Sequence, residues 1–281
     1  MSSSTGGLPR PFRSSDPRAI LPRSVSLALW LPRAAGGYCS PEVAVARVQH
    51  EDEPHTVSVQ IDSEEKVISL IEFVRSLSGS LISAGCAFPV PGDIASAPYF
   101  AAHEGVEAEE LVLLRLRERD GTQRNIALIP QIDRFGNHIE EGYLVRWRRV
   151  EVSSWEYQIL ASAGSIAEAS REVRSGLITI AEELMNLDVA KPSDRYGDLV
   201  DLLRDSVDIT TFVPDDTPAR VVSLLELSAR LRAIVDIARF DDGGALSSAV
   251  ADRRLALLRQ VDATARRAME AAALTSPLVT D

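Results

Sequence analysis

The sequence predicts an α+β protein, with a small, mostly antiparallel sheet and helices in its N-terminal half and an antiparallel helical bundle in its C-terminal half. Short segments before residue 152 alternate apolar and polar residues, which is typical of half-buried strands. From residue 164 to 274, apolar residues instead recur every three, four or seven positions, as on one face of an α-helix. We therefore predict a disordered tail over residues 1–23, an α+β domain over 24–152 and a helical domain over 153–281.

The first two predicted helices follow the tail. The tail is rich in Ser, Gly, Pro and Arg and offers little apolar surface to bury. A short helix is predicted over residues 24–31. A second helix is predicted to run to about residue 49, because Ser40 can cap it, Pro41 suits its first position and Glu42 lies near the positive end of its dipole.

The remaining N-terminal elements are mostly strands. Residues 56–61 alternate in polarity and predict a strand. Asp62 and Glu65 fit a capping box, which predicts a helix from there to about Gly79. Further strands are predicted over residues 84–90, 110–119, 124–130 and 143–152. Because Asp120–Gly121 is a hairpin signal, the last three of these are predicted to be consecutive and antiparallel.

Three long helices with one apolar stripe each are predicted in the C-terminal half. A break at Lys191–Pro192, a shorter helix near residues 199–203, a start at Thr217–Pro218 and a turn at 241–244 separate them. The stripes comprise Ile166, Val173, Leu177, Ile180, Leu184 and Leu187, then Leu224, Leu227, Leu231, Ile234 and Ala238, and finally Leu246, Val250, Leu257, Val261 and Ala268. A helix with one apolar face must bury that face, so the stripes predict mutual packing.

Charge and cysteine content exclude several classes of function. The net charge of −11 is distributed as +4 over residues 1–50, −7 over 51–150 and −8 over 151–281. An acidic surface repels a phosphate backbone, so we expect no nucleic-acid partner. No apolar run approaches the ~20 residues of a membrane span, so we expect no membrane partner. The cysteines Cys39 and Cys86 form no metal or disulfide pattern, and they suit a reducing cytoplasm.

Four arginines on two predicted strands are the main candidates for a binding site. Arg115 and Arg117 share one face of their strand, and Arg146 and Arg148 share one face of theirs. If the strands are neighbours, the four side chains form one cationic patch. The patch would bind a small anion or an acidic partner, or dock the acidic C-terminal half, or remain solvated.

Other charged groups provide weaker candidates. Arg254 lies beside an apolar stripe and would be a ligand residue or half of a partly buried ion pair. Asp241 and Asp242 would hold a metal ion, or they simply form the turn before the last helix. His50 and His55 flank three acids in a loop, without the spacing of a zinc site.

Several segments together resemble a known group of proteins. They are the helix at residues 24–30, Pro89–Val90–Pro91–Gly92–Asp93, Asp241–Asp242–Gly243–Gly244–Ala245, Ala251–Asp252–Arg253–Arg254 and Arg266–Arg267–Ala268. With these segments the chain resembles uncharacterised proteins of high-GC actinobacteria over most of residues 24–274. The resemblance implies a cytoplasmic actinobacterial protein and supplies no activity.

The sequence favours a non-enzymatic regulatory or scaffold protein that acts through protein–protein contacts of its helical half, with a homodimer as one form of such contact. No phosphate-binding loop, nucleophile elbow or zinc-protease motif is present, so no cofactor is predicted. The alternative is a small-anion sensor or enzyme with its site between the two halves. That site would use Arg115, Arg117, Arg146, Arg148 and Arg254 for the anion, with Asp241 and Asp242 as metal or base candidates.

Overall fold

The computed structural model describes residues 21–50, 52–61, 64–136, 141–187, 208–240 and 248–275. It confirms the predicted α+β class. Its strands are β1 (Thr56–Ile61), β2 (Glu64–Ser69), β3 (Leu81–Ala87), β4 (Leu111–Arg117), β5 (Gln123–Gly136) and β6 (Glu141–Glu151). Its helices are α2 (Arg23–Ala35), α3 (Pro41–Gln49), α4 (Leu70–Ser76), α5 (Tyr99–Ala108), α6 (Glu156–Ala163), α7 (Ile166–Leu187), α9 (Ala219–Phe240) and α10 (Ser248–Ala273).

The strands form one mixed sheet of six strands in the order β2-β1-β6-β5-β4-β3. Strands β1 and β6 are parallel, and the other neighbouring pairs are antiparallel. The hairpin predicted at Asp120–Gly121 joins β4 to β5, and Gly121 has the positive φ that such a turn requires. The three consecutive antiparallel strands β4, β5 and β6 thus lie together, as predicted.

The predicted cap at Ser40 begins α3 as expected, but the capping box predicted at Asp62 does not begin a helix. The hydroxyl of Ser40 accepts a hydrogen bond from the amide of Val43 at 3.3 Å. The helix predicted from Asp62 is wrong in its first part, because Glu64–Ser69 forms β2 and pairs with β1 along its whole length. The helix begins only at Leu70, capped by the hydroxyl of Ser69. If residues 64–69 were helical, the amide and carbonyl groups on one edge of β1 would lack partners. Pairing with β2 supplies those hydrogen bonds.

Helices α5 and α6 are absent from the sequence-based prediction. Both are short, at 10 and 8 residues. Helix α5 approaches the sheet closely through Gly105, where an added Cβ would lie 2.7 Å from Leu111 and 3.0 Å from Pro89. Packing against the sheet therefore stabilises a helix whose own sequence carries little helical signal.

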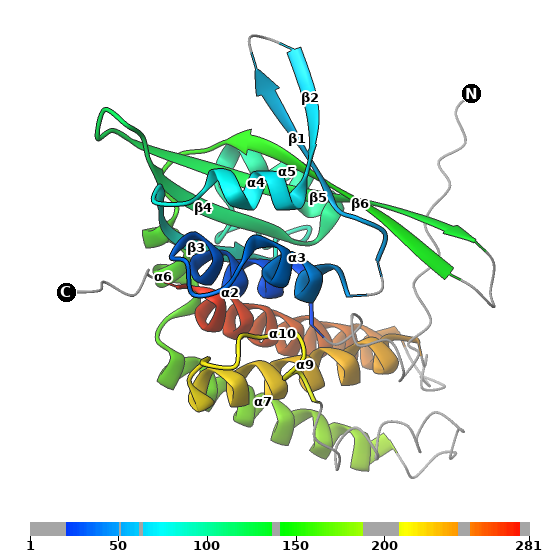
Figure 1. Ribbon diagram of the computed structural model, residues 1–281. Helices are drawn as coiled ribbons and strands as arrows, with labels where there is room; N and C mark the ends of the chain where they lie inside the picture. Colours follow the sequence, from blue (N-terminus) through cyan, green and yellow to red (C-terminus); the bar gives the residue numbers. More distant parts are fainter. Residues whose placement is uncertain are drawn as a thin grey trace, which may run out of the picture.

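Helix α2 lies between the sheet and the long C-terminal helices (Figure 1), and it is buried on all sides. Of its 13 residues, 11 are buried. It contacts β3 and β4 on one side and α10 on another. The segment before it is also packed, since Leu21 is buried. Leu21 and Arg23, which belong to the predicted tail, are thus packed, and residues 1–20 lie outside the described residues.

The three long helices of the C-terminal half each contact the other two. At their meeting point, a Cβ added to Gly176 of α7 would lie 3.2 Å from Leu231 of α9 and 3.9 Å from Val261 of α10. The stripe residues at this point are buried, as predicted. The predicted helix at 199–203 and the turn at 241–244 lie outside the described residues. None of the described helices is long and apolar enough to cross a membrane.

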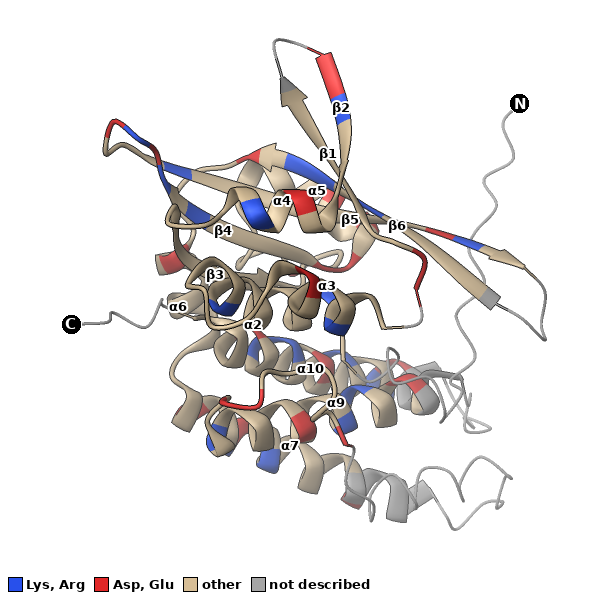
Figure 2. Cartoon of the chain, viewed as in Figure 1, with Lys and Arg blue, Asp and Glu red and all other residues tan. Residues whose placement is uncertain are grey.

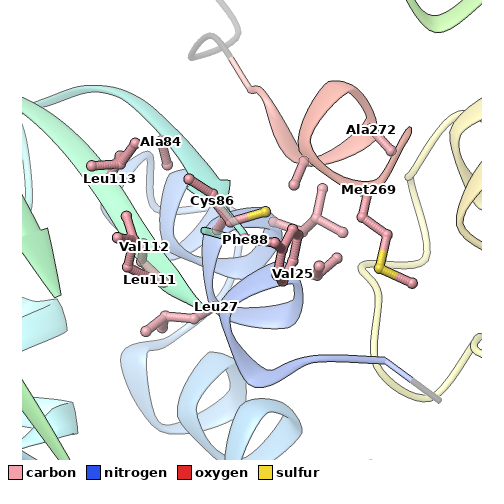
Figure 3. Packing of buried hydrophobic residues seen from close by; sticks show 14 of the residues in the cluster. Val25, Leu27, Ala84, Cys86, Phe88, Leu111, Val112, Leu113, Met269 and Ala272 are labelled. Atoms are coloured by element: carbon pink, nitrogen blue, oxygen red, sulfur yellow. The ribbon is translucent and has the colours of Figure 1, made fainter. Parts of the chain in front are cut away.

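One hydrophobic core joins the two halves. In Figure 3, Phe88, which follows β3, lies among side chains of α2 and α10, including Val25 and Met269. All three residues are completely buried. The halves are therefore not separate cores joined by a linker, because the same apolar cluster contains residues of the sheet, α2 and the C-terminal helices.

The burial of α2 predicts a large effect of core truncation there. Leu27→Ala should lower the free energy of unfolding by about 2–5 kcal/mol, because it leaves a cavity in the layer that joins sheet and helices. Urea unfolding followed by circular dichroism measures the change. Val43→Ala, at a half-exposed position of α3, is the matched control and should change stability by less than about 1 kcal/mol. Equal effects of the two substitutions would contradict the central position of α2.

Candidate functional site

The four predicted arginines lie on one face of the sheet but not in one cluster. Arg115 and Arg117 pair with Asn125 and Gln123 of β5, while Arg146 and Arg148 pair with Gln131 and Ile129. All four partners are odd-numbered positions of β5, so the arginines share a face. However, β5 separates β4 from β6, and Arg115 and Arg148 are offset by four residues of β5, roughly 13 Å along the strand.

Arg115 binds the first helix of the C-terminal half. Its guanidinium donates to a carboxylate oxygen of Glu156 on α6 at 2.6 Å, and it also donates to the side-chain oxygen of Gln123. The hydroxyl of Ser83 donates to the other oxygen of Glu156. Because β3 and β4 both hold this one carboxylate, the group fixes α6 on the sheet, in the manner of a docking contact.

Arg148 instead binds within the N-terminal half. It donates to Glu104 of α5, and this hydrogen bond raises the pKa of Arg148. The pair borders an open hollow of about 550 Å³ between α5 and the sheet, lined also by Glu107, Ala108, Ile129, Pro130, Gln131 and Ile132. The hollow combines two acidic side chains with one arginine that is already paired. Its lining therefore supplies no cluster of free cations for an anion.

The remaining arginines of the predicted patch are solvent-exposed. Figure 2 shows basic positions on β4 and β6 at separate places along the sheet. The side chains of Arg117 and Arg146 form no hydrogen bond or ion pair with any described residue, and both are exposed. Arg117 and Arg146 are thus solvated and Arg115 contacts the C-terminal half, whereas Arg148 binds within the N-terminal half, which the docking prediction did not include.

Arg254 lies on α10, away from the sheet arginines. Its guanidinium donates to the carbonyl of Ala238 at 2.9 Å. Ala238 belongs to the last turn of α9, where carbonyls lack helical partners, so Arg254 serves as a cap that joins the two helices. Asp241 and Asp242 lie outside the described residues. Among the residues that the structure does describe, no group of three or more His, Cys, Asp or Glu side chains could hold a metal ion.

The loop with the two histidines contains a buried polar chain that the sequence did not indicate. Arg23 donates to both carboxylate oxygens of Asp52, at 2.6 and 2.9 Å. His55 lies 3.1 Å from Asp52 and accepts a hydrogen bond from the indole of Trp147 at 3.3 Å. His50 does not join this chain and instead stacks near the ring of Phe212. These hydrogen bonds connect the start of α2 to β6.

A second buried network joins α10 to the segment after β3. Arg266 donates to Asp262 at 3.0 Å, to the carbonyl of Phe88 at 2.7 Å and to Asp93 at 2.9 Å. Arg266 and Asp262, four residues apart on α10, are both buried. The motif around Pro91 forms a tight turn in which Val90 and Asp93 exchange backbone hydrogen bonds, and this turn presents Asp93 to Arg266.

The arrangement of the arginines predicts the response to anions. Phosphate should give no thermal protection, because a ligand stabilises only through a site it can occupy, and Arg115 and Arg148 are already paired. Arg115→Ala should lower the melting temperature modestly, because it leaves partly buried Glu156 without its cation. Differential scanning fluorimetry with and without phosphate measures both effects. Arg117→Ala is the exposed control, expected to melt like the wild type. A phosphate-dependent rise that Arg117→Ala removes would establish an anion site instead.

The comparisons with known proteins match two stretches of the chain. Residues 24–159 match the family model described as the N-terminal domain of Rv1486c-like proteins, and residues 167–270 match the model of the C-terminal domain of the same proteins. No curated protein and no solved structure matches the chain. The matches indicate an actinobacterial family, in keeping with the resemblance of the sequence, and they carry no activity. With one match in each half, the chain belongs to the Rv1486c-like proteins.

Proposed function

We propose that this protein is a non-enzymatic regulatory or scaffold protein that acts through protein–protein contacts of its helical half. The observation that carries the proposal is an apolar stripe on α6 that faces solvent. Tyr157 is 81% exposed and Leu160 is 52% exposed, and Ala161 is exposed beside them. The three residues have i, i+3 and i+4 spacing, so they lie together on one side of the helix.

The rest of α6 is held firmly, which makes the stripe a rigid surface. Ile159 on the helix and Trp155 just before it are completely buried. Gly85 of β3 lets this segment approach, because an added Cβ would lie 2.9 Å from the ring of Trp155. With Glu156 bound by Ser83 and Arg115, the helix cannot turn its stripe inward. A partner that binds the stripe therefore loses little entropy in ordering it.

Exposed apolar residues are common when they are scattered, but a rigid stripe with a tyrosine has the composition of an interface. Tyrosine is enriched among the residues that dominate binding energy. The polar candidates offer no competing chemistry: Arg115, Arg148 and Arg254 each bind protein groups. We also propose that the long helices of the C-terminal half pack antiparallel to one another as a bundle. A second copy of the chain is one candidate for the partner that binds the stripe on α6.

The proposal includes a cytoplasmic location and no nucleic-acid partner. It is supported by the two cysteines, Cys39 and Cys86, which are both free thiols. Burial raises the pKa of Cys86 well above its usual value, so its thiol stays protonated and unreactive. The net charge of −11 opposes binding to a phosphate backbone.

If a partner binds the apolar stripe on α6, polar substitutions in the stripe should abolish the contact. A photo-crosslinking residue at position 161 should give a specific protein adduct in native cells, and Tyr157→Ser with Leu160→Ser should remove the adduct. The double variant should fold normally, because exposed substitutions change stability by about 0.5 kcal/mol or less. Native mass spectrometry then distinguishes a second copy of the chain from another protein.

Leu144→Ser is the matched control for this experiment. It changes a half-exposed apolar residue of β6, outside the helical half, and should leave the adduct intact. Absence of any adduct at position 161, or an adduct that survives the double substitution, would overturn the proposed contact.

A further inference from the structure

The strongest unexplained group in the molecule is the carboxyl of Glu270, which lies inside the contact between α10 and the N-terminal half. Its side chain is 1% exposed. One oxygen, Oε1, accepts hydrogen bonds from the amide of Phe88 at 2.8 Å and from the hydroxyl of Ser96 at 2.7 Å. The other oxygen, Oε2, is buried and has no hydrogen-bond partner among the described residues.

The two donors to Glu270 delimit one segment of the N-terminal half. Phe88 follows β3, and Ser96 lies just before α5, so the carboxyl holds both ends of residues 88–96. Arg266, one turn earlier on α10, holds the middle of the same segment through Asp93 and its first residue through the carbonyl of Phe88. Residues 88–96 are therefore attached to α10 by two buried side chains, one basic and one acidic, and by the more exposed Arg267.

The two attachments respond differently to solvent acidity. Arg266 is cationic throughout the physiological range, and its partners Asp93 and Asp262 are carboxylates that balance it. Glu270 has no such balance at Oε2, and a charged oxygen buried without a partner costs far more free energy than a neutral one. We propose that Glu270 is a proton-operated latch: in its protonated form it holds residues 88–96 on α10, and loss of the proton weakens the contact between the two halves.

The surroundings of Glu270 set the range over which the latch works. Burial raises the pKa of Glu270 from 4.5 to about 7, against the hydrogen bonds from Ser96 and Phe88 and the charge of Arg266, which lower it. Asp93 on the facing segment raises it further. Further charged groups lie around the same segment. Arg267 of α10 lies 3.5 Å from Asp93, and Arg232 of α9 lies over the ring of Phe88. Cys86 of β3 lies near Glu270 and also near Glu110, and burial, together with the negative charges of these two groups, raises the pKa of its thiol.

The direction of the effect follows from proton binding. Between pH 4.5 and about 7 the folded protein binds a proton at Glu270 that the unfolded chain does not. The contribution of Glu270 to stability is therefore greatest at the acidic end and decreases as the pH rises to about 7, after which it is constant. From pH 5 to pH 8 the unfolding equilibrium constant should rise on the order of 50-fold through this one group.

Glu270→Gln tests the latch, because glutamine keeps an oxygen for Phe88 and Ser96 and cannot ionise. Urea unfolding of the full chain at pH 5, 6, 7 and 8 should show that the wild type loses stability relative to the variant as the pH rises. The two proteins should be similar at pH 5, and the variant should be more stable at pH 8. Glu110→Gln provides the comparison background: this buried carboxyl accepts a hydrogen bond from the amide of Ser24, and in the Glu110→Gln protein the further change Glu270→Gln should still remove the pH dependence that it removes from the wild type.

Hydrogen exchange locates the effect. After division by intrinsic exchange rates, amides of residues 88–96 should lose more protection between pH 6 and pH 8 than amides of β4 and β5, and Glu270→Gln should abolish that difference. Should Glu270→Gln fail to fold, Ser96→Ala serves instead: it removes a hydrogen bond that lowers the pKa, so the transition should move to higher pH. Equal pH dependence of wild type and Glu270→Gln, or an unmoved transition in Ser96→Ala, would overturn the proposal.

Discussion

Helix α2 has no solvent-facing side, so the packing of the sheet and of the C-terminal helices depends on how they surround it. A helix buried all round must find apolar neighbours on every side and partners for each polar group at its ends. The sheet supplies one side and α10 another. Glu110 accepts the amide of Ser24 in the first turn. Inside the helix, Ser26 and Trp30 both donate to the carbonyl of Phe212, which ties the segment before α9 to α2.

The proline within α2 shows how one of these conditions is met. Pro32 has no amide hydrogen, so the carbonyl of Ala28, four residues earlier, lacks its usual helical partner. The hydroxyl of Thr275 lies 3.4 Å from that carbonyl. Thr275 also exchanges two backbone hydrogen bonds with Ala84, at the edge strand β3. A residue just beyond α10 thus serves both the helix and the sheet edge, and it attaches the end of α10 to the N-terminal half.

The polar contacts between the halves differ in kind from the apolar core. Apolar burial is non-directional and tolerates small shifts, whereas hydrogen bonds to buried groups fix relative position. Three such contacts lie at different places: Arg115 with Glu156, the carbonyl of Phe212 with α2, and Arg266 and Glu270 with residues 88–96. Of these, only the contact through Glu270 contains a carboxyl whose charge is not balanced at both oxygens. The proposed contact surface on α6 is held in place by the first of these contacts.

The sequence by itself determined the elements whose signals act within a few residues. The cap at Ser40, the alternation in residues 56–61 and the turn at Gly121 appear in the structure where the pattern indicated them, and so do the apolar stripes of the long helices as far as their residues are described. Even here a local signal failed once, because Asp62 and Glu65 resemble a helix start while the neighbouring β1 offers a better use of the same backbone.

Only the tertiary structure decided the partners of the charged residues. Arg115 and Glu156 are 41 residues apart, Arg23 and Asp52 are 29 apart, and Phe88 and Glu270 are 182 apart. Spacing in the sequence showed that the arginines of β4 and β6 each share a face, yet it could not show that β5 lies between those strands. Likewise, Glu270 reads as one polar position on an Ala-rich helix until residues 88–96 cover it. Periodicity is a property of one segment, whereas burial and pairing depend on which segments meet, and that was decided by the packing of the whole chain.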